Sequence, residues 1–296
     1  MVGLGVTLPS PTPIHKETNL RTRDLVLAKI AEHQTSWETG PDSVLRVSNI
    51  GRCLRQSYYI ALTPSDPSIP QRYIDTRALW EMEDGSVHEA DLIRRLQAAG
   101  YVIEGTGENQ KEIYLTLPDG YRATGHPDGV IMSGPDIDEP TLFEAKSMSS
   151  YSYVEIIKAA FATKPGTRKA EVTDWDSTPD WVAGLRIGHK DYWYQVNAYL
   201  LGLGLRQGLM VAKAKDSSGT VKILSSPIDK GLVDGKLHII RFTADEQVQQ
   251  EAVDRLWKLR QAILRHEPPN GEYQLANGDW QCRLCPYVEI CPNGMG

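Results

Sequence analysis

One short segment of the chain carries an acid and an amine at the spacing of a β-strand. Residues 141–146 read TLFEAK, an apolar run interrupted by Glu144 and Lys146. Residues i and i+2 of a strand project from the same face, so both charges are predicted to lie on one side of a buried strand. Taken alone, Glu-x-Lys is more simply explained as a solvated surface pair. The segment is therefore informative only together with other polar groups of the chain.

A second carboxylate, Asp128, lies in the segment GHPDGV at 125–130. We predict that it lies on the strand beside Glu144, just after a bend that glycine permits, although Asp-Gly after a proline is usually only a turn. Two carboxylates beside an amine suit Mg²⁺ or Mn²⁺, which prefer hard oxygen ligands. Such a metal lowers the pKa of a bound water and stabilises charge on a phosphate oxygen, while Lys146 would orient the nucleophile or the phosphate.

Two predicted helices add polar groups to faces that are otherwise apolar. His88 shares the inward face of a helix predicted from about residue 73 to 99. Gln195 and Tyr199 lie at i and i+4 in a helix predicted over 189–205. A buried structural histidine and a polar patch on a core helix are the plain alternatives for these three residues.

The order of these groups along the chain resembles the RecB-like branch of the PD-(D/E)XK nuclease superfamily. The matching motifs are Gly85-Ser86-Val87-His88-Glu89, Gly125-x-x-Asp128, Glu144-x-Lys146 and Gln195-x-x-x-Tyr199. The resemblance implies that three side chains and one backbone carbonyl hold the metal, namely those of His88, Asp128, Glu144 and Ala145. It also implies that Lys146 is catalytic and that Gln195 and Tyr199 support the site. Each motif is weak alone, and only the combination is specific.

The chain has four cysteines, three of them close together near the C-terminus as Cys282-x-x-Cys285-x5-Cys291. Cys53 lies far upstream. Four cysteines are too few for a disulfide framework in a chain of this length, and their spacing is typical of metal ligands. Zinc and a [4Fe–4S] cluster both accept four thiolates. A zinc site beside an unrelated, buried Cys53 therefore stays open as an alternative.

The one-plus-three arrangement of cysteines resembles the iron–sulfur subset of these nucleases. That subset includes CRISPR-associated RecB-like exonucleases, the AddB nuclease domain and phage relatives, and residues 53–59 (CLRQSYY) resemble its first-cysteine helix. The resemblance implies a [4Fe–4S] cluster that joins the two ends of the chain and is bound by Cys53, Cys282, Cys285 and Cys291. Arg52 and Arg55 flank the first cysteine, where phosphate contact and, more simply, solvated surface charge are the two interpretations.

Periodicity along the chain predicts a mixed α/β protein. Helices are expected at 22–36, from Ser48 to 62, at 73–99, at 153–161, at 189–205 and from a Thr243–Glu246 capping box to about His266. Strands are expected at 112–117, 121–132 and 141–146 as an antiparallel meander, and at 208–215 and 237–242.

The resemblance implies an α/β restriction-endonuclease-like core, with a central mixed sheet flanked by helices, and an α-helical iron–sulfur region built from both terminal segments. The expected division of the chain is a loose arm at 1–20, a helical part with the first cluster cysteine at 21–72, a nuclease core at 73–266 with an insertion at about 147–190, and a three-cysteine segment at 267–296.

Composition restricts the class of protein. Apolar residues make up 41% and charged residues 24%, which is ordinary for a globular protein. The N-terminus does not resemble a secretory signal and no apolar run is long enough for a membrane span, so we expect a cytoplasmic protein without a membrane partner. The resemblance implies that the cell is bacterial, archaeal or phage-infected. The net charge of −6 argues mildly against a protein that coats nucleic acid, but not against a nuclease.

The function implied by the resemblance is Mg²⁺- or Mn²⁺-dependent hydrolysis of DNA, by an exonuclease that acts on single strands or ends. The implied settings are CRISPR adaptation and recombination or repair, including that of phages, with protein partners in such a complex and a homo-oligomer as further expectations. A non-catalytic DNA-binding scaffold and a sequence-specific endonuclease are the alternatives. All the predicted catalytic positions are occupied, which disfavours the scaffold, and the cysteines disfavour the endonuclease.

Overall fold

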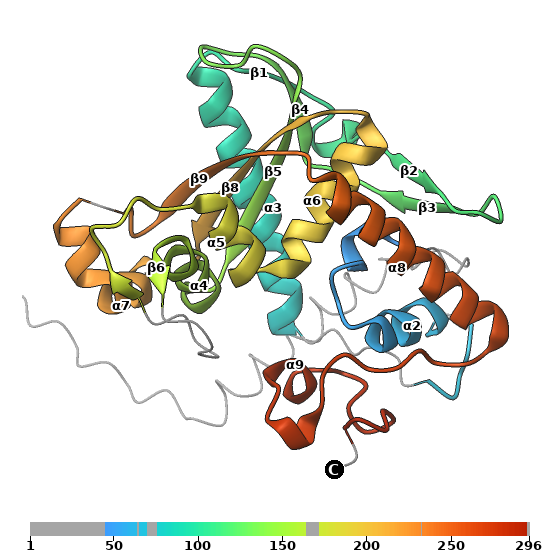
Figure 1. Cartoon of the computed structure of the whole chain (residues 1–296). Coiled ribbons are helices and arrows are strands. Elements are labelled where there is room, and N and C mark those ends of the chain that lie inside the picture. Colours follow the sequence, from blue (N-terminus) through green and yellow to red (C-terminus); the bar gives the residue numbers. More distant parts are fainter. Residues whose placement is uncertain (1–44, 64, 70–75, 164–171, 232, 295–296) are drawn as a thin grey trace, which may run out of the picture.

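The computed structural model describes residues 45–294 except 64, 70–75, 164–171 and 232 (Figure 1). The arm expected at 1–20 and the helix expected at 22–36 lie outside the described residues. In the part that is described, no helix is both long and apolar enough to cross a membrane.

A five-stranded sheet forms the centre of the molecule, with strand order β1-β4-β5-β8-β9. The bounds are β1 (Val102–Glu104), β4 (Gly129–Ser133), β5 (Thr141–Met148), β8 (Gln207–Ala214) and β9 (Leu237–Thr243). Strands β5 and β8 are parallel, whereas the other neighbours are antiparallel. The sheet is therefore mixed, as expected. Three of its strands, β5, β8 and β9, confirm the predictions for 141–146, 208–215 and 237–242.

Helices cover both faces of this sheet (Figure 1). One face packs against α3 (Thr76–Ala98), and the other against α4 (Ser150–Ala160), α5 (Trp181–Gly188) and α6 (Lys190–Leu203). Side chains alternate along a strand, so Phe143 of β5 packs with Leu92 of α3, whereas Leu142 points to the opposite face and joins the core formed by α4 and α6. The helices predicted at 73–99, 153–161 and 189–205 are confirmed.

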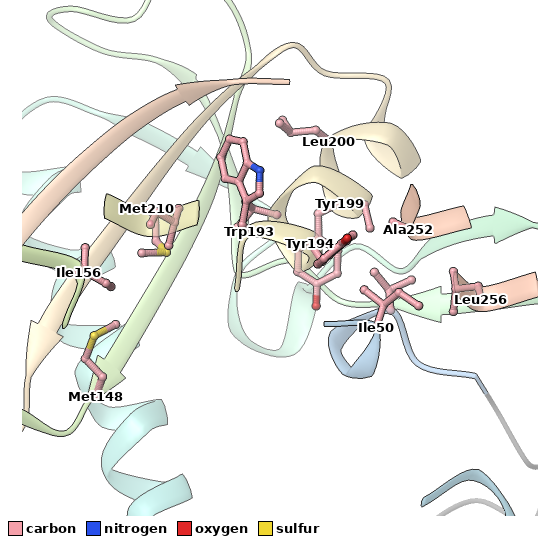
Figure 2. Close-up of a cluster of buried hydrophobic side chains, with 14 of the residues drawn as sticks. Ile50, Met148, Ile156, Trp193, Tyr194, Tyr199, Leu200, Met210, Ala252 and Leu256 are labelled. Atoms are coloured by element: carbon pink, nitrogen blue, oxygen red, sulfur yellow. The ribbon is translucent and has the colours of Figure 1, made fainter. Parts of the chain in front are cut away.

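The larger core lies between the sheet and α6 (Figure 2). Trp193, Tyr199 and Leu200 of α6 are buried there beside Met210 of β8 and Ile156 of α4. These fully buried side chains hold α6 against the sheet at several points. The polar residues of α6 that face the same way are consequently fixed in position as well.

The remaining elements lie around the sheet layers. They are η1 (Val47–Asn49), α2 (Leu54–Leu62), η2 (Gly107–Asn109), α7 (Ser217–Asp229), α8 (Glu246–Arg265), η3 (Leu275–Asn277) and α9 (Trp280–Arg283), with the two-stranded sheets β2 (Ile113–Thr116) with β3 (Arg122–Gly125) and β6 (Ala162–Thr163) with β7 (Val172–Asp174). Helix α8 packs along α6 and α2. Figure 1 shows α9 and the C-terminal segment beside α2, so the two ends of the described chain meet.

The expected antiparallel meander is wrong. The region predicted as one strand at 121–132 is split at residues 126–128 into β3 and β4. Strand β3 pairs only with β2 in a separate hairpin, while β4 enters the central sheet between β1 and β5. The sequence pattern shows that each segment is extended, but the pairing partner is decided by packing.

Two helix starts also differ from prediction. The helix expected from Ser48 is a short η1 turn followed by a bend, and α2 begins only at Leu54, so Cys53 precedes the helix with an extended backbone. The expected capping box at Thr243 is absent as well. Asp245 caps α8 by accepting a hydrogen bond from the Val248 N–H at 3.2 Å, because the chain stays in β9 through Thr243.

Candidate active site and four-cysteine pocket

Glu144 and Lys146 project from the face of β5 that carries α6. The Glu144 side chain is 1% exposed and that of Lys146 is 19% exposed, and the Lys146 Nζ donates to Glu144 Oε1 at 2.5 Å. The i and i+2 spacing of a strand places them together, as predicted. The alternative of a solvated surface pair does not describe them, because both are removed from bulk water.

Asp128 stands where the pairing of β4 with β5 ends. Gly129 is the last paired residue of β4, opposite Phe143. Beyond it, Asp128 Oδ2 accepts a hydrogen bond from the Ala145 N–H at 2.8 Å. The carboxylate therefore takes the place of a strand partner and is held next to Glu144, as the sequence predicted.

The α6 amide and hydroxyl reach the same place. Gln195 donates through Nε2 to Glu144 Oε1 at 3.2 Å and to the Tyr199 hydroxyl at 3.0 Å. A side chain at residue 125 would clash with Tyr199, since a Cβ there would lie 2.7 Å from the Tyr199 Cε1 atom. The glycine of the predicted motif therefore makes room for the tyrosine ring.

One oxygen of this cluster has no partner. Glu144 Oε2 is buried and makes no hydrogen bond to any described residue. Burial, followed by the charge of Asp128, raises the pKa of Glu144 to about 8 against the opposing effect of Lys146. Burial likewise raises the pKa of Asp128. Burial thus disfavours the charged form of both carboxyls, and a bound cation would offset this cost.

Lys146 keeps its proton. Burial lowers the pKa of Lys146, but the Glu144 and Asp128 carboxylates outweigh that effect and raise it above its ordinary value. The Lys146 Nζ also lies 5.4 Å from the centroid of the Tyr192 ring, which stacks on His189 with centroids 4.8 Å apart. The site thus holds an ammonium group with an aromatic neighbour. The other aromatics of this stretch, Trp193 and Tyr194, are buried in the core.

The structure does not bring His88 into this cluster. His88 lies on α3, and its Nδ1 is 2.7 Å from the hydroxyl of Ser147, which points to the opposite face of β5 from Glu144. Burial, followed by the nearby Lys213, lowers the pKa of His88. His88 therefore has a neutral ring. Whether it binds metal stays a prediction.

Glu89 is a site residue that sequence reasoning missed. Burial, followed by the charge of Asp128, raises the pKa of Glu89 to about 7, while Lys146 opposes the shift. Glu89 is thus a third carboxyl within electrostatic reach of the pair. Its position three residues before Leu92, which is buried against the sheet, was the available signal.

The ligand atoms of this cluster suit a hard divalent cation, but the distances between the side chains do not match a metal site. Asp128 and Glu144 supply carboxylate oxygens, one of them buried and unpartnered. As their side chains are placed, however, no three His, Cys, Asp or Glu residues in the described ranges lie close enough together to hold a metal ion. A bound metal therefore requires side-chain rotation.

The four cysteines line one pocket between α2 and the C-terminal segment. All four are free thiols and half-buried. Burial raises the pKa of Cys282 and Cys285, and the other cysteines of the pocket add to the shift in both. The thiols are therefore within electrostatic reach of one another. The far upstream Cys53 and the C-terminal three thus line the same pocket, but as their side chains are placed no three of these described residues lie close enough together to hold a metal ion, and the four-cysteine centre stays a prediction.

The pocket walls are held by side chains rather than by a sheet. Arg255 of α8 donates to the carbonyl oxygens of Ile50 at 2.9 Å and Arg52 at 2.7 Å and to Glu272 Oε1 at 2.5 Å. Glu272 Oε2 in turn accepts a hydrogen bond at 3.2 Å from the N–H of Leu54, which is the first residue of α2. The pair thus joins the C-terminal segment to the bend that carries Cys53.

No protein-family model matches the chain, and no curated protein matches it either. Among solved structures the chain is similar to SSO0001, with 14% identity, 93% of this chain and 98% of that one covered, and a TM-score of 0.46. It is similar to LHK-Exo, an alkaline exonuclease of Laribacter hongkongensis, with 13% identity, 79% and 94% covered, and a TM-score of 0.45. It is also similar to a phage-related exonuclease of Haemophilus somnus 129PT, with 11% identity, 75% and 96% covered, and a TM-score of 0.38.

Proposed function

We propose that this chain is a divalent-metal-dependent nuclease that hydrolyses the phosphodiester bonds of DNA. The observation that supports this most is the convergence of Asp128, Glu144 and Lys146 around a buried carboxylate oxygen without a described partner. Leaving such an oxygen unpaired costs free energy unless a cation or a donor completes it.

Asp128 and Glu144 would hold Mg²⁺ or Mn²⁺, together with the Ala145 carbonyl and His88. The Nδ1 of His88 is engaged by Ser147, which leaves Nε2 as the metal-binding nitrogen, and histidine ligands in proteins commonly bond through the other nitrogen in this way. The metal, when bound, supplies an acidified water and neutralises charge on the phosphate.

The chain's own residues orient the reacting groups. Gln195 and Lys146 both donate to Glu144 Oε1, so Oε2, which has no partner among the described residues, would be the oxygen that binds a metal. The protonated Lys146 presents its ammonium group to a phosphate oxygen or to the attacking water. Glu89, whose pKa is raised to about 7, would be a candidate proton acceptor for this chemistry.

The proposed substrate is single-stranded DNA or a DNA end, which the resemblance to RecB-like nucleases favours. Lys213 and Lys215 lie near His88, since both contribute to lowering its pKa, and such lysines would contact phosphates. The activity would serve either CRISPR adaptation or recombination and repair.

End-labelled single- and double-stranded DNA, incubated with Mg²⁺ or Mn²⁺, tests the activity. We expect Lys146→Ala and Glu144→Ala each to slow digestion by about 100- to 1,000-fold, as loss of a preorganised charge does elsewhere. Lys258→Ala, at an exposed position of α8, is the matched control and should digest like the wild type.

Digestion that persists in both site variants would refute the proposed site. A closed circular single strand distinguishes the mode of attack: it should resist, because an exonuclease needs an end. Cutting of the circle at one sequence would instead support the endonuclease.

We further propose that the cysteine pocket binds a [4Fe–4S] cluster through Cys53, Cys282, Cys285 and Cys291. The shared lining by all four thiols supports a tetrathiolate centre, and the one-plus-three spacing favours iron over zinc. The role would be structural, because the centre would join distant parts of the chain.

Metal analysis and the absorption spectrum of the purified protein test this centre. Iron and sulfide near four per chain, with a broad absorption in the blue, are expected on the stoichiometry of the cluster. One zinc per chain would replace the iron–sulfur proposal with the zinc alternative. Absence of any bound metal after reconstitution would refute both.

A further inference from the structure

Arg55 is a buried arginine in the wall of the four-cysteine pocket. It is the second residue of α2, two positions after Cys53, and is only 8% exposed. Its burial contradicts the interpretation of this arginine as solvated surface charge. A guanidinium group stays protonated in proteins, so a full positive charge is present in this wall.

The hydrogen-bond partners of Arg55 are neutral in the apo protein. Nε donates to the Pro269 carbonyl at 2.7 Å, and Nη1 donates to Asn293 Oδ1 at 2.9 Å. The same Nη1 lies 3.8 Å from the Sγ atom of Cys291. Over the ranges that the structure describes, no ion pair joins Arg55 to a carboxylate.

In the same region, the charge of a second arginine, Arg255, is compensated by a carboxylate. Arg255 reaches both carboxylate oxygens of Glu272. Arg55 has no such partner among the described residues, and a buried charge is costly unless an anion compensates it. The sulfur of Cys291, 3.8 Å from Nη1, would be an anion within hydrogen-bond reach if the thiol lost its proton to a metal.

We propose that Arg55 is the charge partner of an anionic metal–thiolate centre in this pocket, held against the sulfur of Cys291. The inference rests on the proposed four-cysteine centre. Four thiolates exceed the charge of the zinc ion or oxidised cluster that they bind, so the centre is negative. A fixed guanidinium group beside it stabilises the bound metal and, for an iron–sulfur cluster, favours the reduced state, which carries one more negative charge.

Arg55 also tethers two backbone segments through Pro269 and Asn293, and a purely structural tether must be distinguished from a charge partner. Two variants do so. Arg55→Gln removes the charge, whereas Arg55→Lys keeps the charge but loses the planar fork that reaches both oxygens. Arg283→Gln is the control, because Arg283 is exposed and adjoins Cys282 without lining the pocket.

The measurement is the rate at which the purified, metal-loaded protein releases iron or zinc to a chelator in excess. We expect Arg55→Gln to release metal about 10- to 100-fold faster than the wild type, the usual effect of losing an outer partner of a metal ligand. Arg55→Lys should stay near the wild-type rate, and so should Arg283→Gln. For an iron-loaded protein, the midpoint potential of Arg55→Gln should also move to more negative values, with Arg55→Lys close to the wild type.

Equal release from Arg55→Gln and Arg283→Gln would overturn the proposal, and so would equal release from the Gln and Lys variants of Arg55, which is the outcome for a tether. A wild-type chain that binds no metal would overturn it together with the four-cysteine centre. DNA digestion by the same preparations reports on the nuclease site separately.

Discussion

The active site and the cysteine pocket both gather residues from distant parts of the chain, but they are held in different ways. The active site is built on the central sheet, where backbone pairing of β4, β5 and β8 sets the positions of Asp128, Glu144 and Lys146. The pocket lies between α2 and a C-terminal segment of turns, in which the four-residue α9 and the short 3-10 helix η3 are the helical elements among the described residues.

The two regions are thus held together by different kinds of interaction. Around the active site, regular backbone hydrogen bonds and a buried core hold charged groups together even though their charges oppose burial. Around the pocket, a few side-chain contacts and the thiols themselves must supply the cohesion. The candidate active site should therefore stay formed without the proposed metal, whereas the pocket should depend on the proposed four-cysteine centre for stability.

The largest effect should follow loss of a thiol. Cys285→Ser should lower the free energy of unfolding of the metal-loaded protein by up to about 5 kcal/mol, because the centre closes a loop of about 230 residues. Denaturant unfolding measures this. Metal-stripped wild type is the control and should match the variant. If loaded wild type and variant unfold alike, the pocket does not depend on its metal.

A smaller loss should follow from removing the contacts that hold the walls of the cysteine pocket. Arg255→Ala deletes the contacts to Ile50, Arg52 and Glu272 and should cost about 2–3 kcal/mol, since hydrogen bonds of charged groups are involved. Arg260→Ala, on the same helix, breaks a partly exposed pair with Asp119 and should cost about 1 kcal/mol or less. Equal costs in denaturant unfolding would show that Arg255 does not join the C-terminal segment to the bend before Cys53.

The bend before Cys53 touches the helix that carries Gln195, so a substitution there should affect both regions. A Cβ at Gly51 would lie 2.1 Å from the Cα of Asp191 in α6. We expect Gly51→Ala to lower stability by about 1–3 kcal/mol through this clash and to slow DNA digestion. Gly85→Ala, on α3 with no neighbour within 4 Å of its Cβ, should instead raise stability by about 1 kcal/mol. If Gly51→Ala changed neither stability nor DNA digestion, the bend before Cys53 and the active site would be structurally independent.

The smallest effect, counted per pH unit, should be a pH dependence confined to the active site. The pKa of Glu144 is raised from 4.5 to about 8. Between these two pH values, Glu144 is therefore protonated in the metal-free folded state but ionised in the unfolded chain. The stability of the folded state should consequently fall as pH rises through that window. Because metal competes with this proton, the affinity for Mn²⁺ should rise with pH by about tenfold per unit below pH 8, or about 1.4 kcal/mol.

Thermal unfolding with and without Mn²⁺ at pH 6, 7, 8 and 9 measures this dependence. Glu144→Gln cannot titrate at this position and should show a weaker dependence, to which Asp128 and Glu89 still contribute. A stabilisation by Mn²⁺ that is equal at every pH in the wild type would exclude a protonated Glu144 in the metal-free site.

Local pattern predicted much of this molecule correctly. The strand at 141–146 was evident from its apolar run, and its spacing placed Glu144 and Lys146 on one face. The spacing of Gln195 and Tyr199 likewise predicted a shared helix face, which the buried hydrogen bond between them confirms. These features depend only on the repeats of strand and helix, which the sequence states directly.

Other features depended on contacts between distant segments. The meander was wrong because β4 found its partners in β1 and β5, and the capping box was wrong because β9 extends through Thr243. Arg55 was misjudged because a charge two positions from a cysteine gives no sign of its burial.

By itself, the sequence determined which residues share a face of each element and that four thiols have ligand spacing. Only the tertiary structure decided that Asp128 completes the end of a strand pairing, that Glu89 approaches it while His88 turns to Ser147, and that Arg55 enters the pocket wall. The physical reason is that a repeat sets directions within one element, whereas the register between elements and the burial of a charge are set by packing across the whole chain.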